Sequence, residues 1–371
     1  MSAIVFYISG HGFGHASRQI EVINHLVPAL VAAGRSDIIV IRTAADPWLL
    51  DRALRVPAER MPGEIDTGIV QFDSLHQDDE ATFRRAREFY STFDARATAE
   101  AELLRSLKAS LVVSDIAPLA FEAAHRAKVP SVGIANFTWD WIYEGFPELA
   151  VSAGLIISTM RVAYRKAGRA LRLPLHGGFE TFPVIEDIPF IARHASQDRD
   201  TVRRALGIPL DQPVVLASFG AYGVRGLGAI DCVRDWSVVM SDRTHATPGT
   251  APGGAGIVHL SEDAMFDRGF RYEDLVGAVD VVLAKPGYGI VSECIANGTA
   301  LAYTSRGRFA EYDVFAREMP RYLRCAFISN DDLEAGRWRA ALDGAMAQPA
   351  QARARTDGAD VAVARILELL A

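Results

Sequence analysis

The sequence lacks the features that would suit a disulfide-bonded or membrane-spanning protein. Only three cysteines, Cys232, Cys294 and Cys325, occur among 371 residues. They are too few and too scattered for a disulfide framework or a zinc cluster, and we expect buried thiols in a reducing compartment. No apolar run approaches the roughly 18 residues of a membrane span, and the apolar run at 4–8 has no basic region before it. We expect a soluble, cytoplasmic protein with no integral membrane segment and no signal peptide.

A surplus of positive charge is also absent. Lysine and arginine number 39 against 46 aspartates and glutamates, which gives a formal net charge of −7. Proteins that bind nucleic acid generally present a basic face, so a nucleic-acid partner is not expected. With 50% apolar and 23% charged residues, the composition is that of an ordinary globular chain. The length suits two domains, each with its own core.

The sequence does contain a regular alternation of short apolar runs and helical patterns. Continuous apolar runs without polar alternation are typical of parallel strands that helices cover on both faces. Such runs predict strands at residues 4–9, 37–42, 110–114, 129–135, 214–218, 235–240, 256–260, 279–284, 300–304 and 325–329. Apolar residues at helical spacing predict helices at residues 17–33, 118–128 and 350–371.

Two segments interrupt this alternation. Residues 172–200 contain several prolines and glycines and predict a connection between two α/β domains. Residues 247–256, TPGTAPGGAG, predict a flexible surface loop. The simplest interpretation is two doubly wound, Rossmann-like domains in tandem, with a ligand cleft between them.

A glycine-rich segment, GHGFGHASR at residues 10–18, follows the first predicted strand. Gly12 and Gly14 allow the backbone to approach a ligand, and the N-terminus of the following helix favours an anion. His15 replaces the third glycine of a dinucleotide fingerprint, and the second strand ends at residues 42–43 without an acidic side chain. A nicotinamide cofactor is therefore disfavoured, and the absence of Gly-Lys-Ser/Thr excludes a Walker loop.

His15 lies where a doubly wound sheet places its chemistry, at the carboxyl end of a strand. Its imidazole could take a proton from a hydroxyl group, because histidine titrates near neutral pH. It could instead only support the turn, and a metal pair with His11 has no evident third ligand. Asp115 ends another strand of the same predicted sheet. Its carboxylate could orient the imidazole, or it could cap the helix that begins near Pro118.

Two glycine loops in the second half carry candidate ligands for a phosphate. The loops SFGAYG (218–223) and KPGYG (285–289) could present backbone amides to phosphate oxygens. Glu293 follows one helical turn after the second loop and suits the two hydroxyls of a ribose. The candidate residues in the two loops are Gly220, Lys285, Gly287, Tyr288 and Gly289.

A third strand end in the same predicted sheet carries Arg306, Arg308 and Glu311. The arginines could balance the charge of a diphosphate, and Glu311 could accept hydrogen bonds from sugar hydroxyls. Each of these loops alone could be an ordinary tight turn. Their occurrence together at three strand ends favours a ligand that contains both phosphate and sugar.

Residues 136–143, NFTWDWIY, concentrate aromatic side chains in a predicted loop of the first domain. Trp139 could stack on a sugar or on an apolar acceptor, or it could pack between the domains. Asp140 stands between two tryptophans, and a carboxylate there needs a polar partner.

The chain resembles the GT-B glycosyltransferases. Its glycine loop that ends in Gly-His, followed in the second half by Gly-x-Gly before a helical glutamate, is similar to the family 28 transferases. A closer resemblance is to the amino-terminal, glycosyltransferase-like portion of L-arabinokinases. It is carried, in order along residues 10–315, by the segments GHGFGHASR, VVSDIAPLAFEAA, NFTWDWIY, LAKPGYGIVSE and RGRFAEYDVF. The sugar-kinase half of arabinokinases is not matched, so sugar phosphorylation is not implied.

The resemblance implies an α/β protein with the GT-B fold. It implies an acceptor-binding domain at residues 1–190, a nucleotide-sugar-binding domain at 191–355 and a C-terminal helix at 356–371. The implied activity is an inverting glycosyl transfer from a nucleoside-diphosphate sugar, with a uridine-linked donor as the first choice, to a hydroxyl acceptor. His15 would be the general base and Asp115 its orienting partner.

The same resemblance implies roles for residues of the second domain. The backbone of residues 287–289 would line the diphosphate site, Glu293 would hold the ribose and Glu311 would approach the donor sugar. No metal or other cofactor is expected, because the D-x-D sequence at 198–200 lies in the predicted connection. Two alternatives remain, namely a non-catalytic nucleotide-sugar-binding regulatory module and a sugar-nucleotide epimerase of the same fold. The donor sugar, the acceptor and the oligomeric state stay open.

Overall fold

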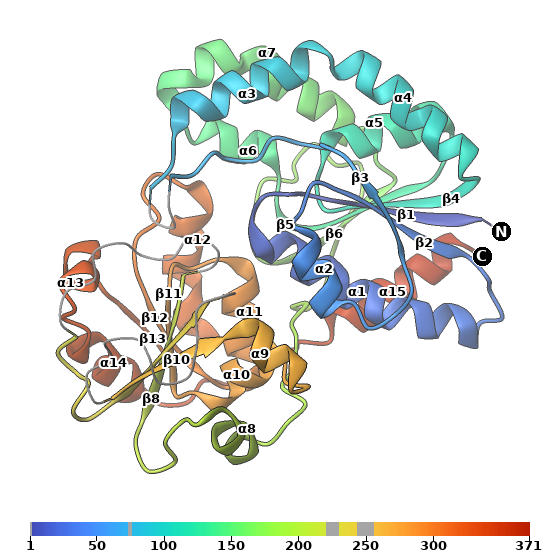
Figure 1. The fold of residues 1–371 in the computed structure, drawn as a ribbon. Coiled ribbons are helices and arrows are strands. Elements are labelled where there is room, and N and C mark those ends of the chain that lie inside the picture. Colours follow the sequence, from blue (N-terminus) through green and yellow to red (C-terminus); the bar gives the residue numbers. More distant parts are fainter. Residues whose placement is uncertain (1, 73–75, 220–229, 243–255) are drawn as a thin grey trace.

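The computed structural model describes residues 2–72, 76–219, 230–242 and 256–371, and it contains two β-sheets with helices on both faces of each (Figure 1). The first sheet has seven strands in the order β3-β2-β1-β4-β5-β6-β7, and the second has six in the order β10-β9-β8-β11-β12-β13. Every neighbouring pair of described strands is parallel. In each sheet the order reverses beside the first strand, which is the doubly wound arrangement that the sequence predicts.

The first sheet and its helices are built from one continuous stretch of chain and one later helix. The strands are β1 (Ala3–Ile8), β2 (Ile38–Thr43), β3 (Glu59–Pro62), β4 (Ala109–Ser114), β5 (Ser131–Phe137), β6 (Arg169–Gly177) and β7 (Ile185–Asp187). The helices are α1 (Gly12–Ala32), α2 (Pro47–Ala53), α3 (Asp79–Ser91), α4 (Phe93–Ser106), α5 (Pro118–Ala127), α6 (Trp139–Glu144), α7 (Pro147–Tyr164) and α15 (Gly358–Leu369).

The second domain repeats the same alternation. Its strands are β8 (Val214–Ser218), β9 (Ser237–Asp242), β10 (Ile257–Ser261), β11 (Val281–Ala284), β12 (Ala300–Tyr303) and β13 (Cys325–Phe327). Its helices are α8 (Arg199–Leu206), α9 (Glu262–Asp267), α10 (Tyr272–Ala278), α11 (Tyr288–Asn297), α12 (Ala310–Glu318), the short 3₁₀ helix η2 (Met319–Arg321), α13 (Asn330–Glu334) and α14 (Arg339–Met346).

The central strand β1 shows why an apolar run without alternation forms a doubly covered strand. All six of its residues are buried. The side chains from Ile4 to Ile8 at even positions belong to the same apolar cluster as Ile20 and Ile23 of α1. The side chains at odd positions join the alanines of α5 on the opposite face. Since both faces carry helices, every position of the strand is apolar.

The chain crosses between the two sheets twice. Residues 188–198 lead from β7 to α8, and the segment after α14 returns so that α15 packs against α1 (Figure 1). The two crossings run side by side, because the N–H of Phe190 donates to the carbonyl of Arg355 and the N–H of Gly358 donates to the carbonyl of Phe190. A Cβ on Gly358 would lie 2.2 Å from the carbonyl oxygen of Pro189, so only glycine fits there.

The structure corrects several boundaries that the sequence predicts. Helix α1 begins at Gly12 and not at residue 17, so the glycine segment forms the first helical turn. Residues 172–200 are not simply a connection, because β6 and β7 extend the first sheet into them. Strand β6 contains Pro174 and ends in glycine, and these residues are more typical of a connection than of a strand in a sheet. The edge strand β3, with the largely exposed sequence ERMP, carries no apolar pattern and was not predicted.

Four further predictions differ or fall outside the described residues. Residues 139–144 form the buried helix α6 and not a loop. The predicted helix at 350–371 begins only at Gly358. The predicted loop at 247–256 lies almost wholly outside the described residues, as does the glycine loop from residue 220 onward.

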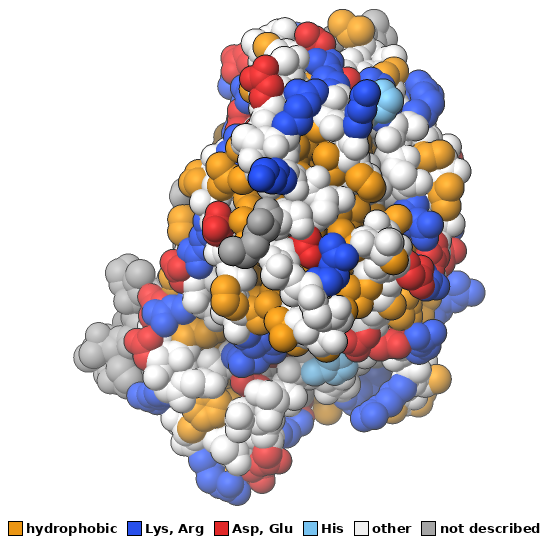
Figure 2. All heavy atoms as spheres, turned by 90° about the vertical axis from the view of Figure 1, so that its right-hand side faces the viewer, with side chains coloured by type: hydrophobic (Ala, Val, Ile, Leu, Met, Phe, Trp, Pro, Cys, Tyr) orange, Lys and Arg blue, Asp and Glu red, His pale blue; other side chains and the backbone are white. Residues whose placement is uncertain are grey.

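The described parts of the chain contain no helix that is long and apolar enough to cross a membrane. The three cysteines are free and buried, as the sequence predicts. On the face shown in Figure 2, lysine and arginine side chains are interspersed with aspartate and glutamate.

Candidate active site

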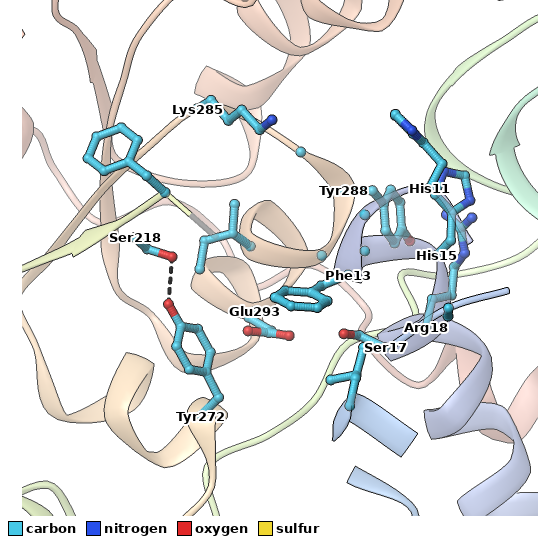
Figure 3. Close-up of a pocket in the computed structure, with 18 of the residues that line it drawn as sticks. His11, Phe13, His15, Ser17, Arg18, Ser218, Tyr272, Lys285, Tyr288 and Glu293 are labelled. Atoms are coloured by element: carbon cyan, nitrogen blue, oxygen red, sulfur yellow. Dashed lines mark hydrogen bonds between the residues drawn. The ribbon is translucent and has the colours of Figure 1, made fainter. Parts of the chain in front are cut away.

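In each sheet the strand order reverses at one place, between β1 and β4 in the first sheet and between β8 and β11 in the second, and both places face a common cleft. In the first sheet the carboxyl ends of β1 and β4 lead to His15 and Asp115, and in the second sheet those of β8 and β11 lead to Ser218 and residues 285–289. Doubly wound sheets bind ligands at this position, where the strand order reverses. The cleft holds a cavity of about 390 Å³ that is lined by residues of both domains (Figure 3). The predicted cleft between the domains is therefore present.

Two helix N-termini meet in this cleft. Gly12 and Gly14 belong to the first turn of α1, and Gly287 and Gly289 stand at the start of α11. A Cβ on Gly289 would lie 3.3 Å from Cα of Gly14, so a larger residue at position 289 would crowd the first turn of α1. Residues 12, 14 and 287–289 all line the cavity. The N–H groups of the first turns and the dipoles of both helices favour an anion here.

His15 and Asp115 form a buried pair. Nδ1 of His15 lies 2.6 Å from Oδ2 of Asp115, whose side chain is 0% exposed. This bond makes Nδ1 the protonated nitrogen of a neutral imidazole and leaves Nε2 as the nitrogen that can accept a proton. The alternative capping role of Asp115 is wrong, because the N-cap of α5 is Ala117 and no side chain caps this helix, while the carboxylate of Asp115 bonds His15 and Arg18.

Arg18 is a site residue that the sequence did not single out. Its guanidinium donates to Oδ1 of Asp115 at 2.5 Å and to Oδ1 of Asn136 at 2.9 Å, and it lies over the ring of Tyr288. Burial would raise the pKa of Asp115, but the charges of Arg18 and His15 lower it below its usual value. The available signal was the spacing, since Arg18 stands three residues after His15 and so on the same face of α1.

A hydrogen-bonded path continues from Arg18 into the second domain. Nδ2 of Asn136 donates to Oε1 of Glu311 at 2.7 Å, and Arg306 donates to the other oxygen of Glu311 at 2.6 Å. Glu311 is only 4% exposed. The carboxylate that was predicted to approach a donor sugar is therefore engaged by one side chain from each domain.

The two arginines of the third strand end have different positions. Arg306 lines the cleft, whereas Arg308 is exposed and is not among the lining residues. Of the two arginines that were predicted to balance a diphosphate, the structure therefore brings Arg306 to the cleft and not Arg308. Lys285 does line the cleft, and its Nζ lies 3.3 Å from Oε1 of Gln71. Gly220 lies outside the described residues.

Glu293 lines the cleft one turn into α11, as predicted, but it is ion-paired within the protein. Arg193 of the connecting segment donates to Oε1 of Glu293 at 2.5 and 2.8 Å and lies 3.3 Å from Glu273. Burial raises the pKa of Glu293 to about 7. The charge of Arg193 lowers this pKa and compensates the burial only in part, and the nearby negative charge of Glu273 raises the pKa further. Arg193 was not predicted, since the connection carried no recognisable motif.

Trp139 and Asp140 do not reach the cleft. Trp139 is 1% exposed and stacks on His15, with ring centroids 5.8 Å apart and planes inclined by 22°. Its Nε1 donates to Asp66, a carboxyl whose pKa burial raises to about 6. Asp140 finds its polar partner in Arg161 at 2.9 Å. Trp139 therefore packs behind His15, whereas Asn136 and Phe137 of the same segment line the cleft.

No metal site is evident in the described parts of the chain. No group of three His, Cys, Asp or Glu side chains is placed to hold an ion there. His11 lines the cleft beside His15, and burial together with the charges of His15 and Arg306 holds its pKa well below the usual value. The D-x-D sequence has a structural role, because Asp198 caps α8 through the N–H of Thr201.

Comparison with known proteins agrees with this architecture. No protein-family model matches the chain. The sequence is 31% identical to L-arabinokinase from Arabidopsis thaliana over 349 residues, which cover 92% of this chain and 32% of that protein. The chain thus spans about a third of the length of the curated relative that it matches.

Solved structures with a similar fold include glycosyltransferases and a putative UDP-N-acetylglucosamine 2-epimerase from Listeria monocytogenes, which matches with a TM-score of 0.55 at 12% identity over 99% of this chain and 95% of that chain. The calicheamicin glycosyltransferase CalG4 matches with a TM-score of 0.62 at 17% identity, over 100% of this chain and 98% of that chain. Arabidopsis thaliana UGT89C1, solved in complex with UDP, matches with a TM-score of 0.57 at 12% identity, over 100% of both chains. Two doubly wound sheets that face each other across a cleft, together with these matches, show that the chain has the GT-B fold and that its sequence is similar to part of L-arabinokinase.

Proposed function

We propose that this protein transfers a sugar from a nucleoside-diphosphate sugar to a hydroxyl group of an acceptor, with inversion at the anomeric carbon and without a metal ion. The observation that carries the proposal is the buried His15–Asp115 pair, which opens into a cleft that two helix N-termini also face. Uridine-linked sugars are the first donors to test. The first domain would bind the acceptor and the second would bind the donor.

His15 would act as the general base. Asp115 holds the proton on Nδ1, so Nε2 takes the proton of the acceptor hydroxyl while the hydroxyl oxygen attacks the anomeric carbon. The bond between this carbon and the diphosphate oxygen breaks, and its electron pair leaves with the nucleoside diphosphate. Attack from the side opposite the leaving group inverts the anomeric centre. Asp115 stabilises the imidazolium that forms.

The leaving group would be stabilised by the protein itself. The N-termini of α1 and α11 converge where Gly14 meets Gly289, and Lys285 and Arg306 line the same cavity. Fixed dipoles and cations aimed at developing negative charge lower the barrier without reorganisation at the moment of reaction. This arrangement supplies the role that a divalent cation plays in metal-dependent transferases.

A second candidate is a regulatory module that binds a nucleotide sugar without turnover. Three carboxylates that would serve the reaction are already engaged within the protein: Asp115 by Arg18, Glu293 by Arg193 and Glu311 by Arg306. The similarity to one third of a longer kinase also supports it, because such a portion could serve a catalytic domain elsewhere.

A thermal-shift screen against UDP-, dTDP- and GDP-sugars tests both candidates, because a ligand that binds only the folded state raises the melting temperature. The donor that binds is then incubated with and without a panel of sugar and alcohol acceptors, in EDTA, and the products are identified by NMR. Transfer gives an inverted glycoside, whereas an epimerase would alter the donor without an acceptor. If no nucleotide sugar raises the melting temperature, the proposal fails.

A pair of histidine variants separates the transferase from the regulatory module. His15→Ala should keep the thermal shift and lose about 100- to 10,000-fold in turnover, which is the usual contribution of a general base. His125→Ala, an exposed histidine on α5, is the matched control and should change neither quantity. A binding protein for which neither wild type nor variant gives product from any acceptor would favour the regulatory module.

A further inference from the structure

The cleft ends in an aromatic wall that the proposed mechanism does not use. Phe13 of α1 and Trp48 of α2 come from the first domain, and Phe266 of α9 comes from the second. The ring centroids of Phe13 and Trp48 are 6.2 Å apart, and those of Trp48 and Phe266 are 5.6 Å apart. All three side chains line the cavity and are only partly buried. The wall therefore joins the two domains and offers ring faces to a ligand.

Hydroxyl groups of the second domain line the same cavity as the aromatic wall. The hydroxyl oxygens of Ser218 and Tyr272 are 2.5 Å apart, and Oγ of Ser241 donates to Glu262 at 3.0 Å. Ser218, Ser241 and Tyr272 all line the cavity. Because a hydroxyl can donate or accept, such a cluster suits a planar group with both donors and acceptors on its edge.

The order of groups along the cleft matches the order of parts in a nucleoside diphosphate. Figure 3 shows the Ser218–Tyr272 pair on one side of Glu293, with Phe13 beside Glu293 and with Tyr288 and His15 on the other side. A ribose at Glu293 would direct its diphosphate toward residues 287–289. Its base would then extend toward the hydroxyl cluster and the aromatic wall.

We propose that the aromatic wall binds the nucleobase of the donor, and that Phe13 and Trp48 of the first domain cover one face of the base. This inference rests on the proposed function, because it takes the ligand to be a nucleoside-diphosphate sugar. The base is then held by both domains and not by the second alone. Phe13 precedes His15 by two residues in the first turn of α1, so the occupied base subsite also fixes the helix that carries the general base.

Isothermal titration calorimetry with UDP tests the wall directly, with dTDP, GDP and ADP as further arms that show which base fits. Stacking of a base on an aromatic side chain contributes about 1–3 kcal/mol by alanine substitution, which is about a 5- to 140-fold change in affinity. Phe13→Ala and Trp48→Ala should each weaken the preferred nucleotide by this factor. Inorganic pyrophosphate, which has no base, should bind the variants as it binds the wild type.

Two more variants separate stacking from other effects. Trp48→Phe keeps a ring but loses the hydrogen bond from Nε1 to Asp263, so it should retain most of the affinity. Phe327→Ala removes an exposed ring that is not among the lining residues and should change nothing.

The outcomes are distinguishable. Unchanged affinity for the preferred nucleotide in Phe13→Ala and Trp48→Ala overturns the inference. If transfer is lost while that affinity is unchanged, the wall belongs to an apolar acceptor. An equal loss for UDP and pyrophosphate overturns it as well, because the effect would then lie at the phosphates. If no nucleoside diphosphate binds the wild type, it is the proposed function that fails.

Discussion

Replacing Asp115 by alanine should destabilise the protein far more than the loss of a surface carboxylate. Asp115 is 0% exposed, and it faces Arg18, whose side chain is 2% exposed. Asp115→Ala leaves the guanidinium buried with only neutral oxygens such as that of Asn136 to accept from it. Breaking a buried pair by removal of one partner costs about 3–5 kcal/mol, so we expect the free energy of unfolding to fall by that amount.

A double-mutant cycle isolates the uncompensated charge as the cause. Arg18→Met removes the cation, so Asp115→Ala should cost less in the Arg18→Met background than in the wild type. Side chains in direct contact within one network typically couple by about 0.5–3 kcal/mol, and the upper half of that range is expected here. Urea denaturation followed by circular dichroism gives all four values.

Asp187→Ala provides the matched control. Asp187 is also ion-paired to an arginine, Arg172, at 2.6 Å, but its side chain is 67% exposed and that of Arg172 is 23% exposed. An exposed pair contributes about 0–1 kcal/mol, so the control should stay within that range. Additive effects of Asp115→Ala and Arg18→Met, or a cost of Asp115→Ala no larger than that of Asp187→Ala, would refute the reasoning.

The pH dependence of the same variant has a definite sign. Burial would raise the pKa of Asp115, yet Arg18 and His15 hold it below the usual value. A carboxyl with a lower pKa in the folded state stabilises the fold above its unfolded pKa of about 3.9 and loses this contribution as the pH falls through the folded value. The stability difference between wild type and Asp115→Ala should therefore persist at neutral pH and shrink below about pH 4.

Three further predictions concern other parts of the molecule. Alanine in place of glycine inside a helix normally raises the free energy of unfolding by about 0.5–1 kcal/mol. Gly289→Ala should not give this gain, because its Cβ would lie 3.3 Å from Cα of Gly14. Gly154→Ala in α7, where the space around a Cβ is open, should give the gain in the same urea assay. His25 has its pKa raised to about 9 by Glu21 and Asp360, so the drop in melting temperature caused by His25→Gln should be present at pH 6 and disappear as the pH rises through about 9. A persistent difference at pH 10 would contradict this assignment. Burial raises the pKa of Glu293 to about 7, so this side chain loses its charge between pH 8 and pH 6. UDP-glucose, whose phosphates do not titrate in this range, should therefore bind more weakly at pH 6 than at pH 8. Calorimetry at both pH values measures this difference, and Glu293→Gln should abolish it.

Much of the fold could be read from the sequence because parallel strands covered on both faces consist of continuous apolar runs. β1, β4, β8 and β11 have this property, and all four were predicted. Edge strands do not need it. β3 is exposed on most of its length and β7 has only three residues, so neither carried a pattern that sequence reasoning could detect.

The candidate site divides in a similar way. His15, Asp115 and Glu293 could be found because each follows the end of a parallel strand, and topology brings strand ends together. The roles of three other residues could not be predicted: Arg18, Asn136 and Arg193, the partner of Glu293. These roles depend on which side chains the cleft places within hydrogen-bond distance. The sequence leaves Trp139 open between acceptor binding and interdomain packing, because the helix α6 that buries it has only six residues and resembles a loop in sequence.

The return of α15 to the first domain constrains how the protein can fold during synthesis. The inner face of α15, with Ala362, Val363 and Ile366, belongs to the same apolar cluster as α1, yet about 180 residues separate the end of β7 from the end of α15. At typical rates of translation the ribosome needs about 10–35 s to add them. During that time the apolar stripe of α1 lacks its cover. The first domain therefore becomes complete only after the second has been made. A fragment that ends near residue 190 would leave the apolar face of α1 that contacts α15 exposed to solvent and prone to aggregation.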